Sequence, residues 1–172
     1  MQPFRPHLAI AIDGGGIRGT IVARALAILE EHLGQPVFDL ARLTAGTSTG
    51  SILAAGLARG VTGETLHALY QQLAPIVFPR TWRSRLWPLT RYRYESDPLA
   101  AALGSVLGEG SLGDYWQTQP ATDVVITLFD LVENRTRFAK PWKREYAGWP
   151  IVQTVLASSS VPTYYPPVQG RF

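Results

Sequence analysis

A serine flanked by glycines is the first feature of this sequence that suggests chemistry. It lies in the pentapeptide Gly46-Thr47-Ser48-Thr49-Gly50, which fits the pattern G-x-S-x-G. On a sharp strand-to-helix turn a serine hydroxyl projects out of the backbone, and glycines two positions away relieve the crowding of such a turn. The free N–H groups and positive dipole end of the following helix favour an oxyanion nearby. Ser48 is therefore the candidate nucleophile, although small residues also gather at tight turns that carry no chemistry.

A run of glycines upstream of Ser48 is the second such feature. The segment reads Asp13-Gly14-Gly15-Gly16-Ile17-Arg18-Gly19. Its bare backbone offers N–H groups, from Gly14, Gly15 and Gly16, to the oxyanion that forms when Ser48 attacks an acyl carbon. Such donors often contribute strongly to catalysis, roughly 3 to 4 kcal/mol each. Arg18 would steady this loop, attract a phosphate, or cap a neighbouring carboxylate as an ordinary surface residue.

The same glycines also fit G-x-G-x-x-G, the pattern of dinucleotide-binding turns. Such a site requires an acidic residue at the end of the next strand, and Asp39 has about the right spacing. The residues just before Asp39 make a poor strand, however, and Asp13 would place negative charge beside a pyrophosphate. The sequence contains no Walker-type lysine pattern. Nucleotide binding is therefore the weaker interpretation of this loop.

A serine nucleophile needs a group that takes its proton, and the histidines do not supply one in the expected order. The sequence contains His7, His32 and His67. A hydrolase triad runs serine, acid, histidine along the chain, and only His67 follows Ser48, with Glu64 as the only acid between them. We therefore expect the histidines to be surface or packing residues, and a carboxylate to act directly on the serine hydroxyl.

The elements that must position these turns follow from hydrophobic spacing. An all-apolar run over 8–12 predicts a buried strand that ends at the glycine turn, and apolar residues at helical spacing over 22–33 predict a helix closed by Gly34. A second strand over 38–45 and a helix over 51–57 enclose the G-x-S-x-G turn. Two strand–turn–helix units in succession favour the α/β class, with a mostly parallel sheet covered by helices.

The later part of the chain adds three helices and a pair of strands, predicted over residues 64–77, 97–107, 151–158, 123–131 and around 138. The helix over 97–107 has a clear start, because Asp97 suits the N-cap and Pro98 the first helical position. The chain stops at Phe172 without a terminating element. We therefore expect it to be cut off at that point.

Composition limits the classes of protein to which this chain can belong. Its 172 residues suit one domain, residues 1–172, and 46% hydrophobic against 17% charged residues permit a real core. The absence of cysteine excludes disulfides, a thiolate nucleophile and cysteine-based metal sites. The net charge of +3 is small for a nucleic-acid binder, and no stretch approaches a membrane span. We expect a soluble, cytoplasmic protein that touches membranes only from outside.

Together these motifs resemble one known family. The segments over 13–19 and 46–50, followed by Ala-Ser-Ser-Ser-Val-Pro-Thr-Tyr-Tyr-Pro-Pro over 157–167, resemble the patatin-like phospholipases in order and spacing. The resemblance implies a three-layer α/β/α fold with a mostly parallel sheet, and a serine–aspartate dyad in which Ser48 attacks an acyl ester of a glycerolipid or phospholipid. It implies no metal and no organic cofactor. The remaining motif residues would support the two turns: Arg18, Gly19, Gly46, Thr47, Thr49 and Gly50.

The aspartate of that dyad is missing from the sequence. In the family it lies in an Asp-Gly-Gly or Asp-Gly-Ala motif shortly after the Pro-Pro loop, and the chain ends before such a motif. The later aspartates that lack a following Gly-Gly or Gly-Ala are Asp97, Asp114, Asp123 and Asp130. We therefore expect a fragment, without its C-terminal part, that has little activity alone. Open alternatives are a base from a separate chain, an inactive lipid-binding or regulatory remnant, and a carboxylesterase or thioesterase that uses the same dyad.

A basic and aromatic stretch that starts at Pro79 and ends at Tyr94 has three interpretations. It interleaves five arginines with two tryptophans and two tyrosines. As a lid near the active site, it would lie at the lipid headgroup layer and give peripheral membrane contact. As a solvated loop, it would pack its tryptophans on the core. Stacking on nucleic-acid bases has no other support in the sequence, and no feature indicates an oligomeric state.

Overall fold

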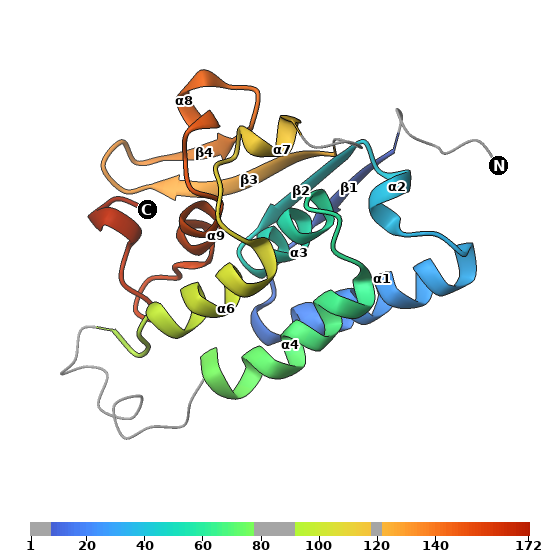
Figure 1. Ribbon diagram of the computed structural model, residues 1–172. Coiled ribbons are helices and arrows are strands. Elements are labelled where there is room, and N and C mark those ends of the chain that lie inside the picture. Colours follow the sequence, from blue (N-terminus) through green and yellow to red (C-terminus); the bar gives the residue numbers. More distant parts are fainter. Residues whose placement is uncertain (1–7, 78–91, 118–121) are drawn as a thin grey trace.

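Four strands form one sheet, and the first three are parallel. The computed structural model describes residues 8–77, 92–117 and 122–172. The strands lie in the order β1 (Ala9–Ile12), β2 (Leu43–Thr47), β3 (Asp123–Asp130) and β4 (Arg135–Ala139) (Figure 1). β4 is antiparallel to β3, whereas β1, β2 and β3 run the same way. The carboxyl ends of β1 and β2 therefore meet at one edge of the sheet, where both glycine-containing turns begin.

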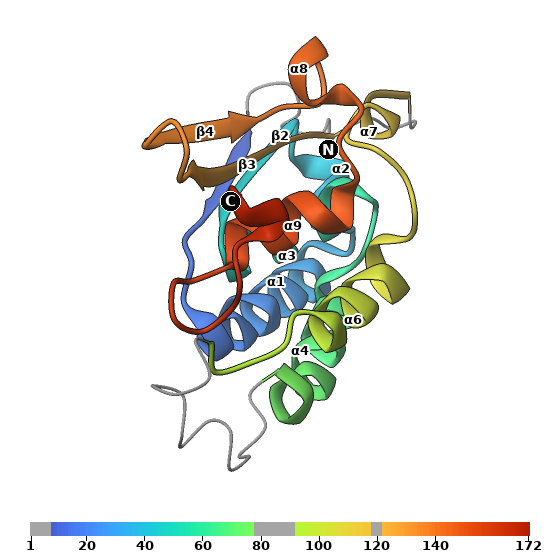
Figure 2. The same ribbon diagram turned by 90° about the vertical axis from the view of Figure 1, so that its left-hand side faces the viewer.

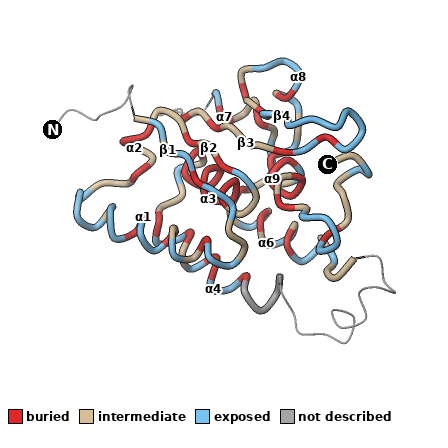
Figure 3. The backbone as a smooth tube through the Cα atoms, turned by 180° about the vertical axis from the view of Figure 1, so that it is seen from behind, coloured by how far each residue is buried: buried red, intermediate tan, exposed pale blue. Residues whose placement is uncertain are grey.

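The long helices form two tiers on one face of the sheet. α3 (Thr49–Ala58) and α9 (Ile151–Ser159) contact the strands, and beyond them pack α1 (Gly19–Leu33), α4 (Gly63–Val77) and α6 (Asp97–Leu107) (Figures 1 and 2). From its second residue onward α3 is buried on every side, because it lies between the sheet and the outer helices (Figure 3). That position explains its small and aliphatic composition, since a helix buried all round has no polar face.

The two faces of β3 differ in burial. Val124, Ile126 and Leu128 are buried on the face that the helices cover. On the other face Phe129 is 46% exposed, and Phe138 of β4, on the same side, is 49% exposed. Over the described residues the long helices thus lie on one side of the sheet. The predicted α/β class and the mostly parallel sheet are confirmed.

The predicted strand over 38–45 is wrong in its first half. The short helix α2 (Val37–Leu40) occupies that part, and β2 begins after it. Glu30 Oε1 accepts the backbone N–H of Val37 at 2.9 Å, and the N–H of Ala41 closes the helical turn on the Val37 carbonyl at 3.0 Å. The cap comes from the preceding helix, so local hydrophobic spacing does not reveal it.

The other predicted helices and strands are confirmed, with small shifts. α1 is closed by Gly34 in the left-handed conformation, with φ 66°. α6 begins at Asp97, but its cap is Ser96 and Pro98 lies in its first turn. The hairpin turns through Asn134, with φ 50°. The sequence patterns do not predict four short elements: η1 (Gly16–Arg18), α7 (Asp114–Gln117), α8 (Arg144–Ala147) and η3 (Val168–Gly170).

Helices that cross membranes need both length and continuous hydrophobicity. No helix within the described ranges combines the two.

Candidate active site

Ser48 lies where β2 passes into α3, on a strained backbone. Its φ and ψ are 54° and −127°, a region that non-glycine residues rarely adopt. Strain of this kind costs about 1–3 kcal/mol and persists only where the surroundings hold it. α3 starts at the next residue, so its free N–H groups and positive dipole end lie beside the serine. The serine therefore stands on the strand-to-helix turn that its motif predicted.

The two glycines of this motif are required by close backbone approaches. A Cβ on Gly46 would lie 2.2 Å from the carbonyl oxygen of Gly50, and a Cβ on Gly50 would lie 2.1 Å from that of Ile12. Neither gap admits a methyl group. The first approach lets α3 start close against β2, and the second packs the start of α3 against the end of β1. Both glycines therefore serve close packing, since neither has a left-handed backbone.

The glycine turn after β1 lies directly against Ser48. A Cβ on Gly14 would lie 2.9 Å from Ser48 Cβ and 3.6 Å from Ser48 Oγ. The N–H of Gly15 donates to Thr49 Oγ1 at 3.0 Å, which ties the turn to the first residue of α3. Gly16 has φ 58°, a conformation that favours glycine. The structure thus brings together two motifs that are well separated in the sequence.

Arg18 and Gly19 support this turn in different ways. Arg18 Nε donates to the Gly15 carbonyl at 3.3 Å, which is the loop-steadying interpretation of this residue. A Cβ on Gly19 would lie 2.6 Å from the Tyr70 hydroxyl oxygen, so Gly19 makes room for that tyrosine. The Tyr70 hydroxyl then donates to the Thr49 carbonyl at 2.8 Å. Burial raises the pKa of Tyr70, so its phenol stays neutral near neutral pH.

Ser158 contacts the candidate nucleophile, and the sequence patterns assign it no role. Its Oγ accepts the backbone N–H of Ser48 at 2.8 Å and donates to the Thr127 carbonyl at 2.5 Å. On the other side of the turn Ser51 Oγ donates to the Ser48 carbonyl at 2.5 Å. The signal for Ser158 is its place in the 157–167 segment, and the signal for Tyr70 is a buried tyrosine on an apolar helix face, which usually finds a partner for its hydroxyl.

A cavity of about 350 Å³ opens beside Ser48. That volume falls within the range of small-molecule sites. Its walls are mostly apolar and include Ile52, Leu73, Leu99 and Tyr165. Burial raises the pKa of Tyr165, so it too stays neutral near neutral pH. The walls that the described residues form contain no aspartate, glutamate or histidine.

Residues 10–171 match the patatin-like phospholipases as a family. The chain belongs to that family. It is 32% identical over 177 residues to a cGAMP-activated phospholipase of Vibrio cholerae, with 92% of this chain and 49% of the relative covered. It is 31% identical to patatin-like protein 4 of Arabidopsis thaliana, with 92% and 43% covered. The chain therefore spans less than half the length of these relatives.

Solved structures show the same fold at lower sequence identity. VipD from Legionella pneumophila superposes with a TM-score of 0.63 at 11% identity, over 96% of this chain and 45% of VipD. ExoU from Pseudomonas aeruginosa, in complex with SpcU, gives 0.56 at 18% identity, over 91% and 39%. At these identities the likeness concerns the fold alone. It confirms the patatin-like α/β architecture.

In this patatin-like chain the later aspartates lie away from the cavity walls. Asp97 and Asp114 begin helices, Asp123 begins β3, and Asp130 ends it. None of the four lines the cavity among the described residues. The structure thus gives no reason to assign one of them as the partner of Ser48.

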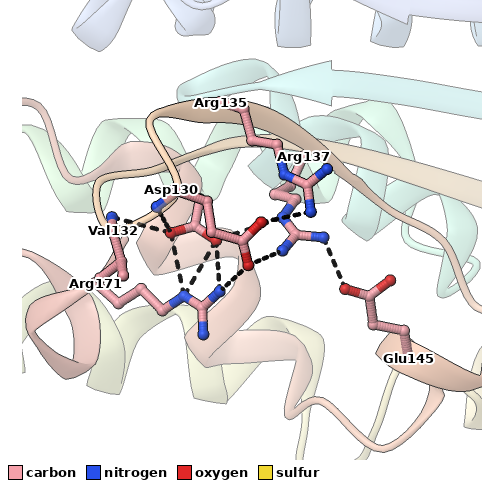
Figure 4. A network of polar contacts seen from close by, with 7 residues as sticks. Asp130, Val132, Arg135, Arg137, Glu145 and Arg171 are labelled. Atoms are coloured by element: carbon pink, nitrogen blue, oxygen red, sulfur yellow. Dashed lines mark hydrogen bonds and ion pairs between the residues drawn. The ribbon is translucent and has the colours of Figure 1, made fainter.

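Asp130 is instead the centre of a network of ion pairs (Figure 4). Its carboxylate is fully buried and accepts Arg171 Nη2 at 2.7 Å and Arg137 Nε at 3.4 Å. The backbone N–H groups of Val132 and Glu133 add hydrogen bonds of 3.1 Å each. The hydrogen bonds from Arg171 above all, with those from the backbone, hold the pKa of this carboxyl well below its usual range. The network fastens the segment after α9 to the β3–β4 hairpin.

The remaining candidate residues from the sequence are Asp39 and the three histidines. Asp39, which the dinucleotide interpretation requires at a strand end, lies inside α2. His32 lies on the exposed side of α1 and His67 on α4, and neither lines the cavity. Residues 1–7, with His7, lie outside the described residues.

Most of the basic and aromatic stretch, residues 79–91, also lies outside the described residues. The structure describes the last three residues of the stretch, 92–94. Among them, the guanidinium of Arg93 stands 4.8 Å over the ring of Tyr164, which lines the cavity. The predicted membrane contact of this stretch stays a prediction.

Proposed function

We propose that the whole protein is a lipid acyl hydrolase of the phospholipase A type, with Ser48 as its nucleophile. One observation carries the proposal: a strained serine at a strand-to-helix turn touches a glycine turn and opens on an apolar cavity. Such a cavity suits a fatty-acyl chain whose ester carbonyl reaches Ser48. Because the chain spans less than half the length of its relatives, the activity is proposed for the whole protein.

In the proposed reaction Ser48 Oγ bonds to the acyl carbon while its proton passes to a carboxylate, and the carbonyl oxygen becomes an oxyanion. Backbone N–H groups of the glycine turn donate to that oxygen. Because the Gly15 N–H already donates to Thr49 Oγ1, we propose the N–H groups of Gly14 and Gly16 as the donors to the oxyanion. When this tetrahedral intermediate collapses, the bond between the acyl carbon and the lysolipid oxygen breaks. The lysolipid oxygen takes the proton from the carboxylic acid, and the acyl group stays bonded to Ser48. Water then attacks the acyl carbon and gives its proton to the carboxylate. The bond between the acyl carbon and Ser48 Oγ breaks, Ser48 Oγ takes that proton back from the carboxylic acid, and the fatty acid leaves.

The carboxylate in this scheme is an aspartate outside these 172 residues. Two facts support that assignment: the described cavity walls carry no acid or histidine, and burial raises the pKa of Tyr70 and Tyr165, so neither phenol ionises to act as a base near neutral pH. The scheme needs no metal or organic cofactor. We further propose a cytoplasmic protein that meets its lipid at a membrane surface.

A catalytically inactive lipid-binding module is the second candidate, because no carboxylate lines the described cavity. A carboxylesterase or thioesterase would use the same site and differ only in substrate. Activity on phosphatidylcholine, compared with a soluble ester and a thioester, separates these enzymes.

The decisive experiment is labelling with a fluorophosphonate probe in two versions of the protein. One is the 172-residue chain, and the other is extended through the downstream coding sequence. We expect label and phosphatidylcholine hydrolysis in the extended version, little in the short one, and neither after Ser48→Ala. Ser105→Ala, at an exposed serine of α6, is the matched control and should change neither. Turnover that survives Ser48→Ala would overturn the assignment, and lipid binding without label in either version would favour the inactive module.

A further inference from the structure

Three large hydrophobic residues are both exposed and part of the cavity walls. Ile17 is 42% exposed, Val161 47% and Tyr164 36%, and all three line the cavity beside Ser48. Side chains that meet both solvent and the cavity must stand at its opening. Ile21, which is 67% exposed, lies in the first turn of α1, four residues after Ile17 of η1, a spacing that places helical side chains on one face. Figure 3 shows exposed residues along α1.

Positive charge accompanies these apolar side chains. Arg18 is exposed and lines the cavity next to Ile17. The guanidinium of Arg93 stands over the ring of Tyr164, another lining residue of the cavity. Among the described residues the cavity walls that carry Arg18 contain no acidic side chain. We call the six residues the mouth rim: Ile17, Arg18, Ile21, Arg93, Val161 and Tyr164.

Single exposed hydrophobic residues are ordinary on protein surfaces. Here they gather around one opening, and the opening leads through an apolar cavity to Ser48. Apolar side chains that enter a bilayer, with arginines at the depth of the phosphates, are typical of surfaces that lie on membranes. A diacyl lipid also has to pass from the bilayer into the cavity without exposing its chains to water.

We propose that the mouth rim is the surface by which this protein docks on a phospholipid bilayer. The inference rests on the proposed lipid substrate, but it concerns binding to the surface and not the chemistry at Ser48. Anionic headgroups should strengthen the contact, because their phosphates pair with the arginines. Added salt should weaken this electrostatic contribution to bilayer binding and leave the contribution of the apolar side chains unchanged.

The test is co-sedimentation with vesicles of phosphatidylcholine that contain about a fifth phosphatidylglycerol, and it needs no turnover. Ile21→Ser should weaken binding about tenfold, because an apolar side chain no longer leaves water on docking. Leu33→Ser is the matched control. Leu33 is 45% exposed and lies on the same helix, about 18 Å further along its axis, so its loss should not change vesicle binding. Arg18→Gln should remove part of the preference for anionic vesicles. Thermal unfolding checks that each variant is folded.

Wild-type binding that is absent, or equal in the Ile21→Ser and Leu33→Ser variants, overturns the inference. The inference is also overturned if Ile21→Ser changes self-association in sedimentation velocity but does not change vesicle binding, because the mouth rim is then a protein interface. If the whole protein hydrolyses a soluble ester while Ile21→Ser binds vesicles normally, the docking surface is wrong and the proposed function stands. If rim-dependent binding occurs without hydrolysis, the surface stands and the proposed function fails.

Discussion

The backbone N–H of Ser48 donates to the Ser158 hydroxyl at 2.8 Å, across 110 positions of sequence. The same hydroxyl donates onward to the carbonyl of Thr127 on β3. One side chain thus links the candidate nucleophile, α9 and the sheet. Because the φ of Ser48 is strained and needs support from its surroundings, we expect Ser158 to position the hydroxyl of the candidate nucleophile.

Ser158→Ala should lower kcat on a soluble ester by roughly ten- to a hundredfold with little change in KM. The lost hydrogen bonds, about 1–3 kcal/mol, affect the placement of Ser48 and not the acyl pocket. Ser158→Thr keeps a hydroxyl and should recover much of the rate. Steady-state kinetics of the active protein, with thermal unfolding alongside, provide the measurement. Equal losses in both variants, or a rise in KM alone, would show that Ser158 has a general structural role.

Gly14→Ala should cost far more turnover than Gly15→Ala. A methyl group on Gly14 would meet Ser48 Cβ at 2.9 Å, whereas one on Gly15 would have its nearest neighbour, Arg18 Cβ, at 3.6 Å. The first change moves backbone donors away from a charge that exists only in the transition state, so we expect a fall in kcat on the order of a hundredfold or more with KM largely kept. Kinetics on a chromogenic ester test this, and a nucleotide titration runs beside it. If Gly14→Ala keeps its turnover and loses a bound nucleotide, the loop serves nucleotide binding.

Gly50→Ala should destabilise the fold, whereas Gly104→Ala should not. A Cβ on Gly50 would collide with the Ile12 carbonyl, and overpacking of a tight contact typically costs about 1–3 kcal/mol or more. A Cβ on Gly104, inside α6, would meet nothing within 4 Å and should stabilise the helix by up to about 1 kcal/mol. Urea unfolding of the two variants and the wild type measures both effects. The packing account is wrong if Gly50→Ala unfolds at the wild-type midpoint.

Asp130→Asn should remove a pH-dependent part of the stability. Arg171 lowers the pKa of Asp130 in the folded protein, so folding favours the charged carboxylate. The stabilisation is complete above the unfolded-state pKa, about 4, and is lost as the pH falls from there through the lower folded-state pKa. The variant should therefore be less stable at pH 7 and lose less stability on acidification. Urea unfolding at a series of pH values between neutral and acid conditions measures the slope, and a slope equal to that of the wild type would contradict the prediction.

Local sequence determined the parts of this protein that depend on a few neighbouring residues. The turn at Ser48 follows from Gly46 and Gly50, because the motif encodes a crowded backbone in five residues. Gly34 ends α1 and Asn134 turns the hairpin, since both sit where the chain needs a positive φ. The α/β class follows in the same way from short apolar runs and helical spacing.

Tertiary structure decided the features that depend on contacts between residues far apart in the sequence. Residues 37–40 are helical because Glu30 of the preceding helix caps Val37. Tyr70 reaches Thr49 because Gly19 leaves it room. The cavity beside Ser48 exists only where several helices and the segment after α9 pack together. Each of these contacts forms because the helices pack on the sheet. Hydrophobic spacing along the chain does not predict which side chains this packing brings into contact.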